Sequence, residues 1–150
     1  MSGWFGKREL PTITHEHFGE LKLEHGVWWG EIQFPPACAM VQVAIDDDGG
    51  QPVSGAWTVV QELGRRWDEL SGPFAVELRT LLEPWQQEFS KDRHPLEEGD
   101  QLFARFQVEA LDIGRTGISV VAFCLKQGWD DARFRLSLDD WIPKALGVDD

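Results

Sequence analysis

The chain has no tyrosine, only two cysteines and few basic residues for its size. Its 150 residues include 14 Lys and Arg against 26 Asp and Glu, which gives a formal net charge of -12. Nucleic-acid backbones and anionic membrane surfaces attract clusters of Lys and Arg, so this balance argues against both as partners. Two cysteines are too few for a disulfide framework, and no apolar run in the sequence is long enough to span a bilayer.

The N-terminus and the cysteines indicate the compartment. The first nine residues, MSGWFGKRE, lack the apolar stretch of a secretory signal peptide, so export by that route is not expected. Cys38 and Cys124 each lie among apolar residues, and we expect two buried, reduced thiols; a single bridge between them is the alternative. Together these features predict a cytoplasmic protein.

Aromatic residues are abundant: eight tryptophans and nine phenylalanines. With 42% hydrophobic and 27% charged residues, the composition is that of a globular protein and not of a disordered one. The polar segment 90–100 is the only candidate boundary, yet the chain on each side of it is too short for a comfortable core. We therefore expect residues 1–150 to form a single α+β domain.

The first third of the chain alternates as strands do. Residues 18–23 and 28–34 flank a tight turn at 25–26, and a two-residue loop there sets a register in which the numbers of facing residues sum to 51. Lys22 then lies opposite Trp29, where a cation–π contact is expected. The same register gathers on one apolar face Gly19, Leu21, Leu23, Trp28, Gly30 and Ile32.

The register also sets Glu20 opposite Glu31, a mildly repulsive pair. A third strand follows the prolines at 35–36 and places Val41, Val43 and Ile45 on one face. It is expected to end at the acidic, glycine-containing turn DDDGG.

The periodicity then changes. Apolar residues recur every three or four positions over 53–70 and again over 74–89, which predicts two helices. The segment 71–73 is expected to separate them, with Pro73 in the first turn of the second. Tryptophans on these stripes and on the inner hairpin face are expected in the core: Trp28, Trp57, Trp67 and Trp85.

The last third returns to alternation. Strands are predicted over 102–110, 118–125 and 134–138, and the aspartates at 139–140 are expected to cap a short last helix through Leu146. Strands joined by short turns favour antiparallel pairing. The predicted fold class is therefore α+β, an antiparallel sheet with two central helices packed on one face and a short C-terminal helix.

Exposed tryptophan beside carboxylates is a frequent pattern at protein–protein hot spots, and a surplus of acid suits a basic partner. Trp29 has two interpretations, a partner contact or a cover over the sheet. The acidic turn is either a docking knob or a solvated turn. The candidate partner-binding residues are Trp29, Asp46, Asp47, Asp48, Trp129, Asp130 and Asp131.

The sequence contains no catalytic motif. His15 and His17 are two apart, which on a strand would put both imidazoles on one face, as half of a zinc or iron site; two surface histidines are the plainer interpretation. We therefore expect no enzyme activity, no cofactor and no metal. A metal-dependent enzyme using His15 and His17 is one alternative, and a housekeeping scaffold domain is another.

Three segments form a familiar set: FGEL at 18–21, VWWGEI at 27–32 and VQVAI at 41–45, followed by the acidic glycine turn. With the helices that follow, they resemble a group of uncharacterised bacterial domains with an FG-x-L strand, a W-x-G strand and a helix after a D-x-G turn. Members of that group are suspected of being immunity proteins beside polymorphic toxins. The resemblance covers about the first 90 residues and transfers no catalytic residues. It implies a small cytoplasmic α+β protein that binds and blocks a toxin.

Overall fold

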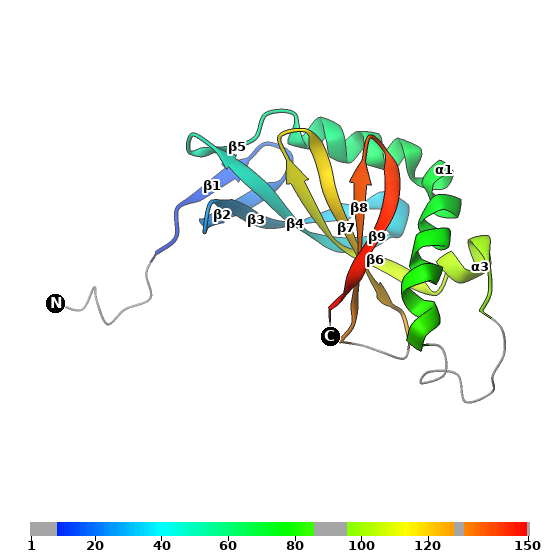
Figure 1. Cartoon of the computed structure of the whole chain (residues 1–150). Coiled ribbons are helices and arrows are strands. Elements are labelled where there is room, and N and C mark those ends of the chain that lie inside the picture. Colours follow the sequence, from blue (N-terminus) through cyan, green and yellow to red (C-terminus); the bar gives the residue numbers. More distant parts are fainter. Residues whose placement is uncertain (1–8, 86–95, 128–130, 150) are drawn as a thin grey trace.

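The computed structural model describes residues 9–85, 96–127 and 131–149. Within these ranges nine strands form one sheet in the order β1-β2-β3-β4-β6-β7-β8-β9, with β5 paired to β4 beside this path (Figure 1). The described ranges also contain two α-helices and two short 3-10 helices. The strands are β1 (Thr12–His15), β2 (Gly19–Glu24), β3 (Val27–Phe34), β4 (Ala39–Asp48), β5 (Gln51–Pro52), β6 (Phe106–Gly114), β7 (Gly117–Leu125), β8 (Arg133–Asp139) and β9 (Ile142–Asp149). The helical elements are η2 (Pro35–Ala37), α1 (Ala56–Leu82), η3 (Glu83–Trp85) and α3 (Gly99–Phe103).

The predicted α+β class with a mainly antiparallel sheet is confirmed. All strand pairs of the described residues are antiparallel except β4 with β6, which run parallel. A parallel pair needs a crossover connection, and α1 supplies it between the two strands. No helix in the described ranges is both long and apolar enough to cross a membrane.

The first hairpin follows the predicted turn. His25 and Gly26 both adopt positive φ, at 54° and 75°, as the two central residues of a type I′ turn require. Lys22 faces Trp29 in the resulting ladder, which confirms the expected register next to the turn.

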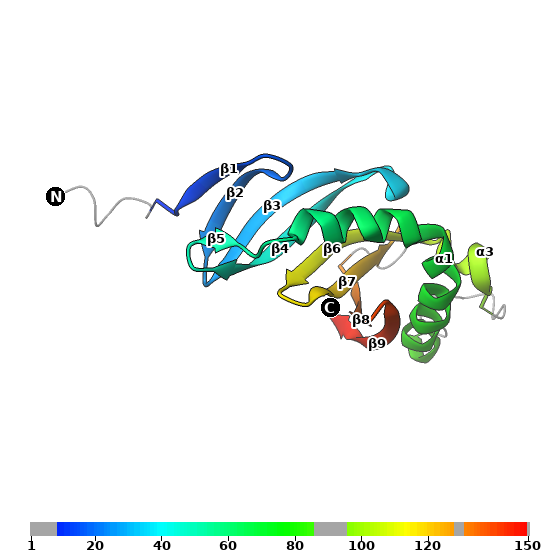
Figure 2. The same ribbon diagram turned by 90° about the horizontal axis from the view of Figure 1, so that it is seen from above.

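The expected pair of central helices is wrong, because α1 continues without a break through residues 71–73. Pro73 lacks the N–H for one helical hydrogen bond and its ring crowds the preceding turn, which bends a helix without necessarily ending it. Figures 1 and 2 show α1 changing direction partway along its length. The apolar stripes are confirmed as far as Leu82, where α1 ends; the rest of the predicted second stripe is not helical at 83–85 and lies outside the described residues from 86 to 89. The residues that α1 buries are Ala56, Val60, Leu63, Trp67, Leu70, Phe74, Ala75, Leu78 and Leu82.

Two expectations for the last third are also wrong. Leu102 lies in the short helix α3, and the strand begins only at Phe106. The expected C-terminal helix is strand β9, which pairs with β8 through a turn at Asp140 and Trp141. These residues have φ of 50° and 63°, again the pattern of a two-residue hairpin turn. Arg66 of α1 lies 4.8 Å above the Trp141 ring and ties the turn to the helix.

The core lies between α1 and one side of the sheet. Trp67 occupies its centre, with ring centroids 5.1 Å from Phe34 and 5.5 Å from Phe74. Such aromatic pairs add to the stabilisation from burial. Of the other tryptophans expected inside, Trp28 is buried, Trp57 is only partly buried, and Trp85 is exposed, which corrects that assignment.

Candidate functional site

The sheet has one covered and one open side. Helix α1 lies across one side and α3 packs against α1, so no helix of the described residues lies on the other side, which we call the open face (Figure 2). Alternation along the strands sends every second side chain to this face. Its polar side chains include Glu20, Lys22, Glu24, Trp29, Glu31, Gln42, Asp46, Asp112, Arg133 and Arg135.

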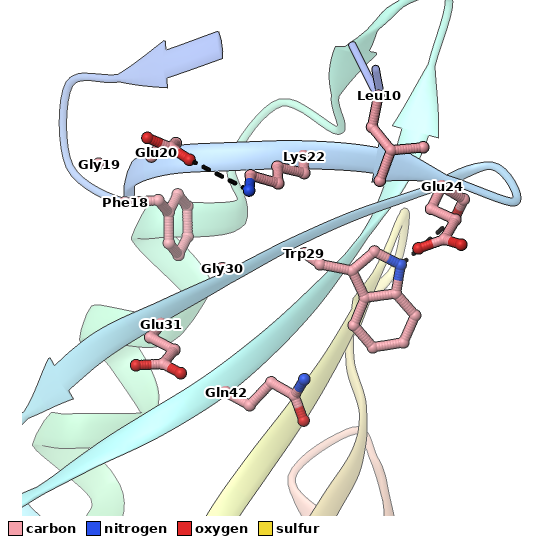
Figure 3. Close-up of a pocket in the computed structure, with 10 residues that line it drawn as sticks. All are labelled: Leu10, Phe18, Gly19, Glu20, Lys22, Glu24, Trp29, Gly30, Glu31 and Gln42. Carbon is pink, nitrogen blue, oxygen red and sulfur yellow. Dashed lines mark hydrogen bonds and ion pairs between the residues drawn. The ribbon is translucent and has the colours of Figure 1, made fainter. Parts of the chain in front are cut away.

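A hollow of about 540 Å³ opens on this face between β2 and β3. We call it the β2–β3 hollow. Figure 3 shows carboxylates and one ammonium group around its rim and the Trp29 indole at one end. Its lining includes Phe18, Glu20, Lys22, Glu24, Trp29, Gly30 and Glu31.

The hollow exists because β2 and β3 separate. Their paired register ends at Lys22 and Trp29, so the expected pairing of Glu20 with Glu31 does not form. Glu20 instead faces Thr14 across β1. Strand β3 remains paired with β4 to its last residue, so β2 is the strand that turns away.

Gly30 marks the point of separation. A Cβ at this position would lie 2.6 Å from Leu21 Cδ2 and 3.1 Å from the Glu20 carbonyl oxygen. The Leu21 side chain, which is fully buried, occupies the space that any larger residue at 30 would need. Glycine therefore permits the last close contact between the strands before they diverge.

Trp29 is 40% exposed and lies along the hairpin. Its indole Nε1–H donates a hydrogen bond to the Glu24 carbonyl oxygen at 3.3 Å, which fixes the ring at the end of the hollow. The expected cation–π contact with Lys22 does not form between these two described residues. Lys22 Nζ lies instead 3.7 Å from Glu20 Oε1.

The charge of the hollow is negative. Its lining contributes three carboxylates, from Glu20, Glu24 and Glu31, against the single ammonium group of Lys22. An excess of carboxylates on one surface creates a negative potential that attracts cations. The hollow therefore combines an aromatic surface with an acidic rim, the two groups that recognise ammonium and guanidinium ions.

The expected turn over DDDGG is wrong for its aspartates, because β4 continues through Asp48 and pairs with β5, so that only Gly49 and Gly50 form the turn. Asp47 Oδ1 accepts hydrogen bonds from the Trp28 indole Nε1–H at 2.9 Å and from the Gly50 N–H at 3.1 Å. Asp48 lies 3.4 Å from Arg115 in an exposed ion pair. Asp46 is exposed on the open face, and its carboxylate has no hydrogen bond or ion pair to another described residue. Asp47 and Asp48 thus have partners within the fold, and Asp46 is left as a candidate contact.

Asp112 extends the acidic surface to β6. It lies beside Ala44 on the open face, where its outer part is exposed, and partial burial of its carboxyl group by the neighbouring strands raises the pKa of that group above the ordinary value. The nearby positive charges of Arg133 and Arg135 oppose that shift, whereas the negative charge of Asp46 adds to it. Sequence patterning did not single out this residue, because its neighbours across the sheet are distant in sequence.

The predicted contact residues near the end of β7, Trp129, Asp130 and Asp131, are described only in part. Trp129 and Asp130 lie outside the described residues. Asp131 is exposed and directly precedes the buried Ala132. The candidate site around the β2–β3 hollow is therefore defined without Trp129, Asp130 and Asp131.

Comparisons with protein-family models, with curated proteins and with solved structures find no match to this chain.

The histidine pair has local roles. Strand β1 ends at His15, and His17 lies in the following turn, so the expected strand spacing is wrong. His15 Nδ1 accepts hydrogen bonds from the backbone N–H groups of His17 and Phe18, at 3.0 and 3.2 Å. The His17 ring stacks on Trp57 with centroids 5.0 Å apart. Within the described ranges no group of three or more His, Cys, Asp or Glu side chains is placed to hold a metal ion.

The two cysteines are both free thiols. Cys38 is exposed, which corrects the expectation that it is buried, whereas Cys124 is partly covered on β7. Burial and the neighbouring Glu109 carboxylate raise the pKa of the Cys124 thiol, so it is less readily ionised than an ordinary cysteine.

Proposed function

We propose that the protein is a non-catalytic binding protein whose partner docks on the open face around the β2–β3 hollow. The observation that carries this proposal is the position of Trp29, an exposed aromatic at the end of a hollow with an acidic rim. Tryptophans in such positions are the commonest anchors of protein interfaces. A sheet face held in place by a packed core also binds with little ordering cost.

The charge of this region supports a basic partner. Glu20, Glu24 and Glu31 rim the hollow, and Asp46 and Asp112 continue the acidic surface over β4 and β6. Complementary charge accelerates encounter and discriminates against acidic proteins. The net charge of -12 acts in the same direction at long range.

The resemblance of the first 90 residues to suspected immunity proteins supports a particular kind of partner. A toxin domain with a basic cleft, such as one that cleaves nucleic acid, would meet the acidic open face with complementary charge. Occlusion of that cleft would neutralise the toxin without any chemistry by this protein.

Co-expression with the product of the neighbouring gene tests the proposed class. We expect the partner alone to arrest growth, and the pair to restore growth and to co-purify. Growth arrest that this protein does not relieve, or relief without a complex, would remove the immunity-protein proposal.

Charge-reversal variants test the proposed surface with the same complex. We expect Asp46→Lys and Glu31→Lys each to slow association about tenfold and to flatten its dependence on salt. Asp68→Lys, on the exposed side of α1, is the matched control and should leave the association rate nearly unchanged. An equal effect of all three variants would mean that only net charge matters and that the open face is not the docking site.

A further inference from the structure

We propose that the open edge of β3 accepts an extended, basic segment of the partner as an added antiparallel strand, with its cationic side chains in the β2–β3 hollow. This inference rests on the proposed function and specifies how the open face holds its partner. Strand addition uses main-chain hydrogen bonds for affinity and pockets beside the edge for specificity.

The backbone of β3 is oriented for this role. The Asp47 N–H donates to the Gly26 carbonyl, and the register from there places the hydrogen bonds of even-numbered β3 residues toward β4. Odd-numbered residues therefore direct their N–H and C=O groups toward β2. Beyond Trp29 no residue of β2 is in register with them, so Glu31 and Gln33 have no strand partner on that side within the described part of the chain.

The edge is held in strand geometry before anything binds. Ile32 and Phe34 are buried against the core, and β3 and β4 remain paired as far as Phe34 with Ala39. An incoming strand would therefore order only itself, which lowers the entropic cost of binding. The open length is short, so side chains must contribute the rest of the affinity.

The flanking side chains specify a basic segment. Residues directly opposite each other in an antiparallel pair share a face, so every second side chain of the added strand would lie on the open face beside Glu31 and Gln33. Arginine at these positions reaches the carboxylates of Glu31 and Glu20 and the exposed ring of Trp29. The sheet edge at β9 lacks this acidic setting, since it carries Lys144 and Pro143.

The test uses a short capped peptide in which arginine alternates with valine, added to isotope-labelled full-length protein. In the free protein we expect the Gln33 amide to exchange with solvent faster than the amides of Ile32 and Phe34, which face β4. Saturating peptide should slow Gln33 exchange at least about tenfold and should shift the resonances of Trp29 and Glu31.

Matched peptides separate strand pairing from simple charge attraction. N-methylation of the arginine amides, which face β3 in the antiparallel arrangement, should weaken binding about tenfold, whereas N-methylation of the valine amides should not. Gln33→Pro, which removes the edge N–H, should also weaken binding, and Gln33→Ala, which keeps it, should not. Equal binding by both methylated peptides, or protection confined to β1 or β9, would overturn the proposal.

Failure of strand addition and failure of the proposed binding function give different results. A complex with the neighbouring gene product in which the Gln33 amide stays unprotected would overturn strand addition and leave the binding function intact. Protection of Gln33 by the peptide without any rescue of growth would support strand addition and count against the immunity role.

Discussion

At the scale of single residues, Asp47 shows how a surface-type residue can be fixed by the fold. Its carboxylate accepts hydrogen bonds from the buried Trp28 indole and from the Gly50 N–H. Removing the acceptor would leave a donor without a partner in the core, which costs more than the bond itself contributes. Asp47, near the end of β4, therefore links β3 and the β4–β5 turn through its side chain.

We expect Asp47→Ala to lower the free energy of unfolding by roughly 1–3 kcal/mol, because the Trp28 N–H loses its acceptor. Asp47→Asn is the control: its amide oxygen can still accept, so most of the stability should remain. Urea unfolding followed by far-UV circular dichroism measures both. An Asn variant as unstable as the Ala variant would show that charge, and not the hydrogen-bond acceptor, is what matters at this position.

Asp112 gives a prediction about pH. Burial raises the pKa of Asp112 in the folded state above its value in the unfolded chain, so the folded state holds this proton more tightly. Its contribution to stability therefore falls as pH rises through the interval between the two pKa values, and the penalty is complete above that interval.

Asp112→Asn removes that penalty, so we expect the variant to be more stable than the parent at pH 7. The gain should shrink toward zero as the pH falls below the ordinary pKa of an aspartate. Chemical unfolding at several pH values measures the difference, with Asp68→Asn on the exposed side of α1 as a control. A gain that is independent of pH would contradict the proposed role of burial.

At the scale of elements, the sequence pattern correctly predicted those features that depend on residues close to each other in the chain. The turn at His25 and Gly26, the strand containing Val43 and the apolar stripes of α1 were all readable, because each depends on residues close in sequence. Pro73 was read as a boundary, but apolar contacts on both sides hold the helix together through it. Tertiary packing here outweighs the local penalty of proline.

The errors near the end of the chain have a related cause. The aspartate at 140 resembles a helix cap in sequence, yet Asp140 and Trp141 form a two-residue hairpin turn in which neither central residue is glycine. The strand that follows is stabilised by β8 and α1, neither of which is visible in the local pattern.

Of the candidate site, the sequence indicated Trp29 but not the hollow beside it. Trp29 could be singled out because an outward tryptophan needs an explanation. The hollow beside it depends on where β2 leaves β3, and the regular register gave no sign of that departure. In retrospect the glycine at 30, between Trp29 and Glu31, was the available signal, since glycine within a strand often marks a close approach of two chains.

At the scale of the whole molecule, the sheet consists of two antiparallel halves. Strands β1 to β4 form one and β6 to β9 the other, joined by the parallel pair of β4 with β6 and by α1 across one side (Figure 1). Both halves contribute to one apolar cluster with α1. The open face is continuous across the joint, and acidic side chains of β2 to β4 give way to Arg133 and Arg135 on β8.

This arrangement predicts that the two halves unfold together, as the expected single domain requires. Leu111 lies on the strand that joins them, opposite Val43, and is fully buried. We expect Leu111→Ala to lower the free energy of unfolding by about 2–5 kcal/mol, because the cavity it leaves lies in the shared core. Amide signals of β3 and of β8 should then lose their native positions at one common, lowered urea concentration. Leu146→Ala, at an exposed site on β9, is the control and should shift that midpoint little. Separate midpoints for the two strands would mean that the halves are independent folding units, which the single core does not allow.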